Sequence, residues 1–260
     1  MNNEELYIKL IGENPSYIKN IESPSYEMKL IALRKSGTVI RFIKDVTEDL
    51  KMEAVKSNAH AIEYIKNPSE NLSLEAVSKD WNTLSYIDNP SDKVILCALN
   101  QCGNAIKYVE NPNIDMKRKA VLKNYEAIEF IENPEEEIQL IAIKSYWGAI
   151  KFISNPTIVV QIEAIKSKAE AIKYIDIYDD ESMKLFIFYN INVLKYVYQD
   201  IEAFIVTQAL MDKFSGDTVD EGYIKDFMEL EVLSMDKIKF IKEYGNKRTK
   251  QLLIDYKLSI

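Results

Sequence analysis

The hydrophobic and polar positions of the chain recur at a fixed spacing along most of its length. Asn-Pro pairs appear every 22 residues, from Asn67-Pro68 to Asn155-Pro156. An alanine column keeps the same spacing and consists of Ala32, Ala54, Ala76, Ala98, Ala120, Ala142 and Ala164. An aromatic column, in which every residue is followed by Ile or Val, consists of Phe42, Tyr64, Tyr86, Tyr108, Phe130, Phe152, Tyr174 and Tyr196. Coincident columns at one spacing identify an internal repeat.

Each copy of the repeat predicts two short helices. Asn is a preferred N-cap residue and Pro suits the first helical position. We therefore expect the first helix of successive copies to begin at Asn67, Asn89, Asn111, Asn133 and Asn155. The second helix, as in residues 127–131, is short enough to be either α or 3₁₀. The alanine column marks where adjacent helices are expected to approach most closely.

The repeat also predicts the fold. A helix pair this short cannot bury its apolar face alone, so successive copies must stack. We expect an all-α fold, a right-handed α-solenoid (a superhelix) of about eleven 22-residue two-helix repeats, forming a single domain over residues 1–260. Residues 1–22 would form a degenerate N-terminal repeat, residues 23–200 the regular repeats, and residues 201–260 degenerate repeats and a C-terminal cap.

The residues of the repeat carry a resemblance to known repeats. Asn67-Pro68, Ala76-Val77 and residues 61–65 (Ala-Ile-Glu-Tyr-Ile) show the consensus most clearly. This unit resembles the short α-helical repeats of the leucine-rich repeat variant type, and related uncharacterised bacterial and phage repeat families. The resemblance covers nearly the whole chain, although a unit of 22 residues is slightly shorter than the variant repeat. It implies a superhelical scaffold and supplies no catalytic residues.

Composition argues against several functional classes. The longest uncharged stretch, residues 94–106, is too short for a transmembrane helix, and the acidic N-terminus lacks a secretory pattern. A cytosolic location in a bacterium, or in a host infected by a phage that encodes the protein, is therefore expected. Cys97, Cys102 and the single His60 cannot assemble a soft-ligand zinc site, and no nucleotide-binding or nucleophile motif is present. We expect no enzyme activity, cofactor, metal or small-molecule substrate, and no membrane partner.

Charge is distributed unevenly. The formal net charge is −8, and residues 176–236 contain fourteen acidic residues against four lysines. This segment fits a solvated surface near a cap, and the alternative is a surface for a basic partner or a mimic of nucleic acid. The position before the aromatic column is largely basic: Lys19, Arg41, Glu63, Ser85, Lys107, Glu129, Lys151, Lys173 and Lys195. A basic stripe suits nucleic acid, whereas the negative net charge argues against it.

The candidate binding residues come from a loop column that breaks its own pattern. It reads Pro15, Gly37, Ala59, Trp81, Gly103, Tyr125, Trp147 and Ala169. Most copies need only a small residue, yet both tryptophans fall here and Tyr146 precedes Trp147. Because exposed Trp and Tyr dominate interface energetics, we predict a partner-binding edge with a lysine rim, formed by Trp81, Tyr125, Tyr146, Trp147, Lys107, Lys151 and Lys173. The alternative is that the rings pack over the adjacent loop as a local lid.

Together these features predict a non-enzymatic scaffold that binds a partner protein through the curved surface of the solenoid. Two alternatives belong to other classes. One is a phage or mobile-element inhibitor of a host defence complex, such as a CRISPR-like nucleoprotein. The other is a HEAT-like solenoid that binds nucleic acid.

Overall fold

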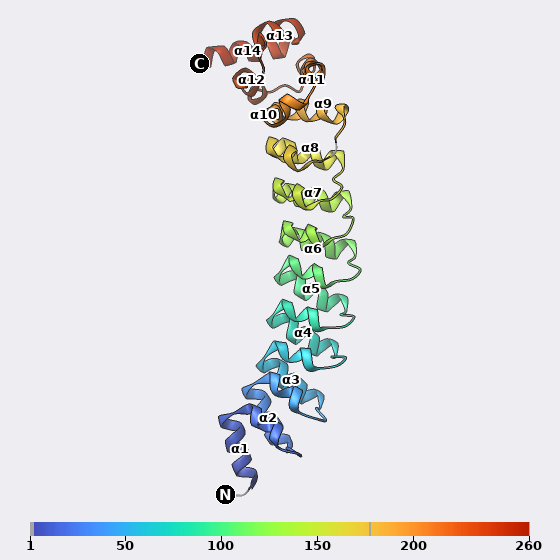
Figure 1. Ribbon diagram of the computed structural model, residues 1–260, viewed down its shortest axis with the longest axis vertical. Coiled ribbons are helices and arrows are strands. Elements are labelled where there is room, and N and C mark those ends of the chain that lie inside the picture. Colours follow the sequence, from blue (N-terminus) through green and yellow to red (C-terminus); the bar gives the residue numbers. More distant parts are fainter. Residues whose placement is uncertain (1–2, 177, 260) are drawn as a thin grey trace. The chain divides into compact units, whose positions relative to one another are not determined.

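The computed structural model describes residues 3–176 and 178–259, and every regular element in them is a helix (Figure 1). None of the described residues lies in a strand. The chain divides into two compact units, residues 1–131 and 132–260. The single domain expected from the sequence stays a prediction. No helix among the described residues has the length and apolar character needed to span a membrane.

The first unit consists of α helices that alternate with 3₁₀ helices. Its α helices are α1 (Asn3–Glu13), α2 (Tyr26–Lys35), α3 (Glu48–Ser57), α4 (Glu70–Lys79), α5 (Asp92–Gln101) and α6 (Ile114–Lys123). Its 3₁₀ helices are η1 (Pro15–Asn20), η2 (Gly37–Phe42), η3 (Ala59–Tyr64), η4 (Trp81–Tyr86), η5 (Gly103–Tyr108) and η6 (Tyr125–Phe130). From α1 to α6, successive α helices contact one another, and each contacts its own 3₁₀ helix, so the pairs of this unit stack in chain order.

The second unit continues the pattern and then departs from it. The regular part consists of α7 (Glu136–Ser145), η7 (Trp147–Phe152), α8 (Ile158–Ser167), η8 (Ala169–Tyr174) and α9 (Asp180–Tyr189). The pair of α9 is broken into η9 (Ile191–Val193), α10 (Leu194–Val197) and η10 (Tyr198–Asp200). The C-terminal helices are α11 (Ala203–Ser215), α12 (Glu221–Glu229), α13 (Lys237–Tyr244) and α14 (Lys247–Ser259).

These elements confirm the predicted repeat. From α2 to α9, the α helices begin every 22 residues, at positions 26, 48, 70, 92, 114, 136, 158 and 180. The fold is an all-α solenoid of helix pairs. The structure also decides a question that the sequence left open, because the second helix of every regular pair is 3₁₀.

The predicted helix starts were wrong by three residues. Asn67, Asn89 and Asn133 have φ values of 48°, 49° and 45°, in the left-handed region, and so belong to a turn before the helix. Asn tolerates this conformation, and the following Pro disfavours the right-handed helical conformation at the residue before it. The helices predicted at Asn67, Asn89, Asn111, Asn133 and Asn155 begin instead at Glu70, Asp92, Ile114, Glu136 and Ile158. The N-cap is therefore the residue two positions after Asn, as where Ser69 accepts the backbone N–H of Leu72.

The alanine column lies where the repeats approach most closely. All seven of its residues are fully buried. A Cβ atom added to Gly37 would lie 2.0 Å from the carbonyl oxygen of Ala54, and one added to Gly103 would lie 2.3 Å from that of Ala120. The turn of one repeat therefore sits directly against the alanine of the next, which confirms the crowding expected from the sequence.

Polar side chains at both helix ends also join successive repeats. Lys79 Nζ donates a hydrogen bond of 2.6 Å to the carbonyl oxygen of Lys56, at the end of the preceding α helix. At the opposite end, the hydroxyl of the N-cap residue Ser69 donates a bond of 2.6 Å to Glu48, in the first turn of the preceding helix. The Lys79 bond satisfies a backbone carbonyl that the helix end leaves without an intrahelical partner, and the Ser69 bond links an N-cap side chain to the preceding helix.

The C-terminal helices are held together differently. The rings of Phe214 and Phe227 are 4.8 Å apart between centroids, and Phe240 lies 6.1 Å from Phe214 and 6.3 Å from Phe227. The Tyr223 hydroxyl donates a buried hydrogen bond of 2.7 Å to the carbonyl oxygen of Ile187 in α9. Burial raises the pKa of this hydroxyl. An aromatic core and long-range hydrogen bonds thus replace the alanine column.

Candidate protein-binding site

The site is built from the turn that joins α7 to η7. In five other repeats, the residue before the 3₁₀ helix is Asn or Asp, and its side chain accepts the backbone N–H two positions on: Asn14, Asn58, Asp80, Asn124 and Asn190. Tyr146 occupies this position before η7 and makes no such cap. Ser36, Cys102 and Lys168 also lack the cap.

A neighbouring glycine accommodates the Tyr146 ring. A Cβ atom added to Gly148 would lie 2.4 Å from Cε1 of Tyr146, so the ring covers the position where a side chain would begin. In other repeats this position holds larger residues, among them Asn82, Asn104 and Glu126. Tyr146 and Gly148 therefore depart from the repeat pattern as a pair, because the first requires the second.

Three aromatic side chains meet at this turn, and we call Tyr146, Trp147 and Tyr174 the aromatic cluster. The ring of Trp147 lies 5.6 Å from that of Tyr146 and 6.4 Å from that of Tyr174 in the following repeat. Tyr146 and Tyr174 are 41% and 43% exposed, and Trp147 is half-buried. Trp147 thus packs over its neighbour, as the lid alternative expected, while the two tyrosines remain open to solvent.

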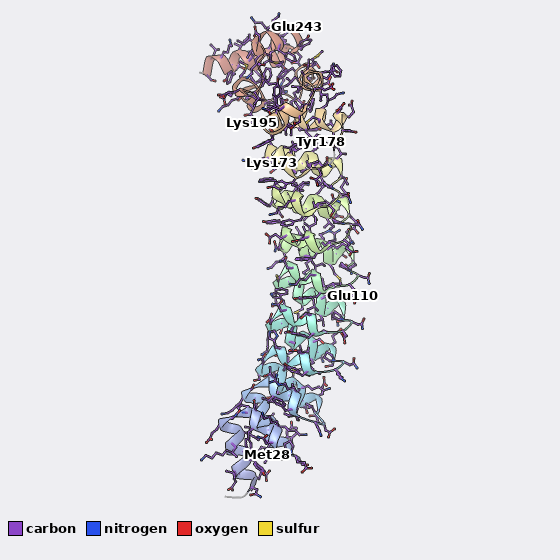
Figure 2. The ribbon with its side chains drawn as sticks, in the orientation of Figure 1. Met28, Glu110, Lys173, Tyr178, Lys195 and Glu243 are labelled. Carbon is purple, nitrogen blue, oxygen red and sulfur yellow. The ribbon has the colours of Figure 1, made fainter. Side chains whose placement is uncertain are left out.

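Lysines lie beside the rings of the same unit. Lys151 Nζ is 4.5 Å from the centroid of Phe152, and Lys173 Nζ is 4.6 Å from that of Tyr196. Glu170 accepts a hydrogen bond of 3.0 Å from Lys173 and thereby raises the pKa of that ammonium group. Lys173 and Lys195 lie on the same side of this unit in Figure 2. These contacts have the geometry of cation–π pairs, and the second places positive charge close to an exposed ring, that of Tyr196.

The remaining predicted residues lie in the first unit. Trp81 packs on Tyr108 of the following repeat, with ring centroids 6.3 Å apart. Lys107 Nζ lies 5.7 Å from the Trp81 ring and 4.8 Å from the Tyr108 ring. Tyr125 is half-buried at the start of η6. The predicted residues therefore fall into two sets, one around Trp81 and Lys107 and one around Tyr146 and Trp147.

Sequence reasoning did not select the exposed rings of the aromatic column. Phe42, Tyr64, Tyr86, Phe130, Tyr174 and Tyr196 are each 38–43% exposed. Arg41 shows how cations accompany them, because its guanidinium carbon lies 4.8 Å from the Phe42 ring centroid and 5.5 Å from the Tyr64 ring centroid. For Phe42, Tyr174 and Tyr196, a signal was present as a basic residue directly before the aromatic one. It was missed because a regular aromatic column is also what a buried ridge would show.

The two cysteines and the single histidine lie outside the aromatic cluster. Cys97 and Cys102 are free thiols and half-buried. His60 Nε2 lies 2.9 Å from a carboxylate oxygen of Asp80, the capping residue of the next repeat. Among residues 3–176 and 178–259, no three His, Cys, Asp or Glu side chains are grouped so that they could hold a metal ion.

Fold and site together define a class: an α-solenoid of paired α and 3₁₀ helices with a partly exposed aromatic cluster at one turn. Comparisons with known protein families, curated proteins and solved structures find no match to this chain. The resemblance to short α-helical repeats therefore rests on the 22-residue helix pairs themselves.

Proposed function

We propose that the protein is a non-catalytic scaffold that binds a partner protein through the aromatic cluster, with Lys151 and Lys173 at its rim. The observation that carries this proposal is the paired departure of Tyr146 and Gly148 from the repeat. The resemblance of the repeat unit to the leucine-rich repeat variant type, whose members imply scaffolds, supports the same function.

The turn does not require this departure, because other repeats form it with a capping Asn or Asp and a larger residue at the position of Gly148. An Asn at the position of Tyr146 would cap η7, as Asn124 caps η6. Replacing a capping side chain typically costs about 0.5–2 kcal/mol, and glycine inside a helix costs up to about 1 kcal/mol. The chain accepts both changes and presents two tyrosines and a tryptophan at one turn. A break in local rules is expected where a site serves function.

The chemistry of the cluster suits a protein surface. Tyr and Trp supply large apolar contact areas with few rotatable bonds and a polar group that can bond to a partner. Lysines at the rim add long-range attraction and orientation more than affinity. A partner with an apolar patch bordered by acidic residues would match both features.

The test compares three variants of the full chain in quantitative capture from cell lysate, followed by titration of the captured protein after purification. Trp147→Ala should weaken binding by about 2 kcal/mol or more, as loss of an interface anchor does. Tyr146→Asn should weaken binding while raising the thermal midpoint, because it restores the cap. Tyr26→Ala removes a ring that is 54% exposed in the first unit, and serves as the matched control that should leave binding unchanged.

Tyr146→Asn is expected to lower the affinity for the partner and to raise the thermal midpoint, and these opposite changes make the test decisive. If the cluster is only a packed lid, this variant and Trp147→Ala will alter stability and leave affinity unchanged, and the proposal fails. Retention on heparin and binding of single-stranded DNA are measured in parallel. Binding of DNA that Trp147→Ala abolishes would assign the cluster to nucleic acid instead.

A further inference from the structure

The first unit contains a groove formed by none of the residues of the aromatic cluster. It has a volume of about 640 Å³ and is formed where the loops after η3, η4 and η5 follow one another. Its lining includes Asn67, Asn89 and Asn111, one from each of three successive repeats. The acidic residues Asp88, Asp92 and Glu110 also line it, together with Tyr108. Figure 2 shows Glu110 at the edge of this unit.

The three amides have no internal role as hydrogen-bonding groups. In the part of the chain that the structure describes, no hydrogen bond engages the side chain of Asn67, Asn89 or Asn111, and all three residues are exposed. Either Asn or Gly suits the left-handed backbone at Asn67 and Asn89, so these turns can form without the amides. Asn111 is moreover not among the described residues with positive φ. The three exposed carboxamides are therefore open to a hydrogen-bonding partner from outside the chain.

The carboxylates give the groove its charge. No Lys, Arg or His lines it, and no ion pair engages Asp88, Asp92 or Glu110 within the described residues. The fold does not require acids here, because the positions that correspond to Asp88 and Glu110 in the two preceding repeats are Lys44 and Lys66. At this position the charge therefore changes from positive in the two preceding repeats to negative along the groove.

We propose that this groove binds an extended, basic peptide segment of a partner protein. A carboxamide can donate to a peptide carbonyl and accept from a peptide N–H at once. Stacked helices lie about 8–10 Å apart, which corresponds to about three residues of extended chain. Asn67, Asn89 and Asn111 would thus meet the backbone of the segment at every third residue. Asp88, Asp92 and Glu110 would pair with its lysine or arginine side chains.

The probe is a fluorescein-labelled peptide that alternates lysine and serine over about ten residues, and fluorescence anisotropy with the full chain measures its affinity. Wild-type protein should bind it saturably, and a peptide that alternates glutamate and serine should not bind. The double variant Asn67→Gly/Asn89→Gly keeps the left-handed turns and removes two amides, so affinity should fall by about tenfold. Asp88→Asn/Glu110→Gln should lower affinity by at least as much and flatten its dependence on salt.

The chain supplies a matched control. Asn133 has the same left-handed backbone, with φ of 45°, but does not line the groove. Asn133→Gly should therefore leave peptide affinity unchanged, and the thermal midpoints of all three variants confirm that they fold.

Three results would overturn the proposal. The first is absence of saturable binding by wild-type protein. The second is equal loss of affinity in Asn67→Gly/Asn89→Gly and Asn133→Gly, or no loss in either. The third is displacement of the labelled peptide by spermine as effectively as by unlabelled peptide, because spermine carries positive charge without a peptide backbone. None of these results bears on the aromatic cluster, which lies in the other unit and is tested by its own variants.

Discussion

The repeats of the first unit and the C-terminal helices α11–α14 bury their apolar side chains by different means. In the repeats of the first unit, the α helices from α1 to α6 contact one another in chain order, and small residues such as Ala54 and Ala76 are fully buried. In the C-terminal region, α11 contacts α13 and α12 contacts α14, so each skips a neighbour. Large rings such as Phe214 and Phe227 fill the interior there.

This contrast shows what a regular spacing achieves. In the repeats, one pattern of small and branched residues is used many times, and each copy depends only on its neighbours. In the C-terminal region, single residues serve several elements at once. The carbonyl oxygen of Phe214 accepts hydrogen bonds from the backbone N–H of Asn246 and from the hydroxyl of Thr249. The ring of Phe214 contacts three other aromatic rings. A destabilising substitution should therefore affect only neighbouring helices in the repeats, and all of α11–α14 in the C-terminal region.

Phe214→Ala should produce the largest effect. Removing a fully buried ring typically costs about 3–5 kcal/mol, and here it also leaves Phe227 and Phe240 without their common neighbour. Hydrogen exchange followed by mass spectrometry should show loss of protection throughout α11–α14, with α3–α5 unchanged. Equal loss of protection in α3–α5 would show that the repeats depend on distant contacts and would remove the contrast.

Ala120→Leu should have a smaller and more local effect. Ala120 is fully buried, and its carbonyl oxygen already lies against Gly103. Overpacking of this kind costs about 1–3 kcal/mol, and faster exchange should be confined to α5, η5 and α6. Leu122→Ala is a matched control because Leu122 lies in the same helix and is 63% exposed, so its thermal midpoint should stay close to that of the wild type. A silent Ala120→Leu variant would contradict the close packing of the column.

The same contrast explains how much of the fold the sequence could predict. Ala98 and Ala142 were assigned to the interior because a position that stays small in seven copies must be crowded in all of them. The helix starts were misplaced because Asn has two local uses, as an N-cap and in the left-handed turn, and the Asn-Pro pair alone does not separate them. The aromatic core around Phe214 has no period, so pattern reasoning gave no means of pairing its residues.

The candidate site was predicted in part for a related reason. Trp147 and Tyr146 stood out because they interrupt a column, and an interruption is visible in one sequence. Tyr174 was overlooked because it conforms to its column, and only the structure shows its ring open to solvent and in contact with Trp147. The groove amides were likewise regular. A residue that conforms to its repeat column can be placed in the fold from the sequence. Whether its side chain is exposed depends on which faces of the repeat the neighbouring copies cover.

The smallest expected effect concerns the polar bonds between repeats. The Ser69 hydroxyl, followed by Lys51, lowers the pKa of Glu48 below its usual range. A carboxyl whose pKa is lower in the folded state stabilises the protein above its unfolded pKa of about 4.3, and this contribution disappears as the pH falls through the folded value. Because the Glu48 side chain is 52% exposed, solvent screening should limit the contribution to below about 1 kcal/mol.

Glu48→Gln should therefore lower the thermal midpoint slightly at pH 7 and lose that difference near pH 3, since glutamine still accepts from Ser69 but does not titrate. Glu27→Gln is the matched control, because Glu27 lies in the first turn of α2 and makes no such bond within the described residues. Its midpoint should follow that of the wild type at both pH values. The opposite result would be a thermal midpoint of Glu48→Gln that lies as far below that of the wild type at pH 3 as at pH 7. In that case the Ser69 bond stabilises the protein through its geometry and not through the charge of Glu48. The polar contacts between repeats would then contribute nothing to the dependence of stability on pH, and the alanine column would remain the main source of cohesion.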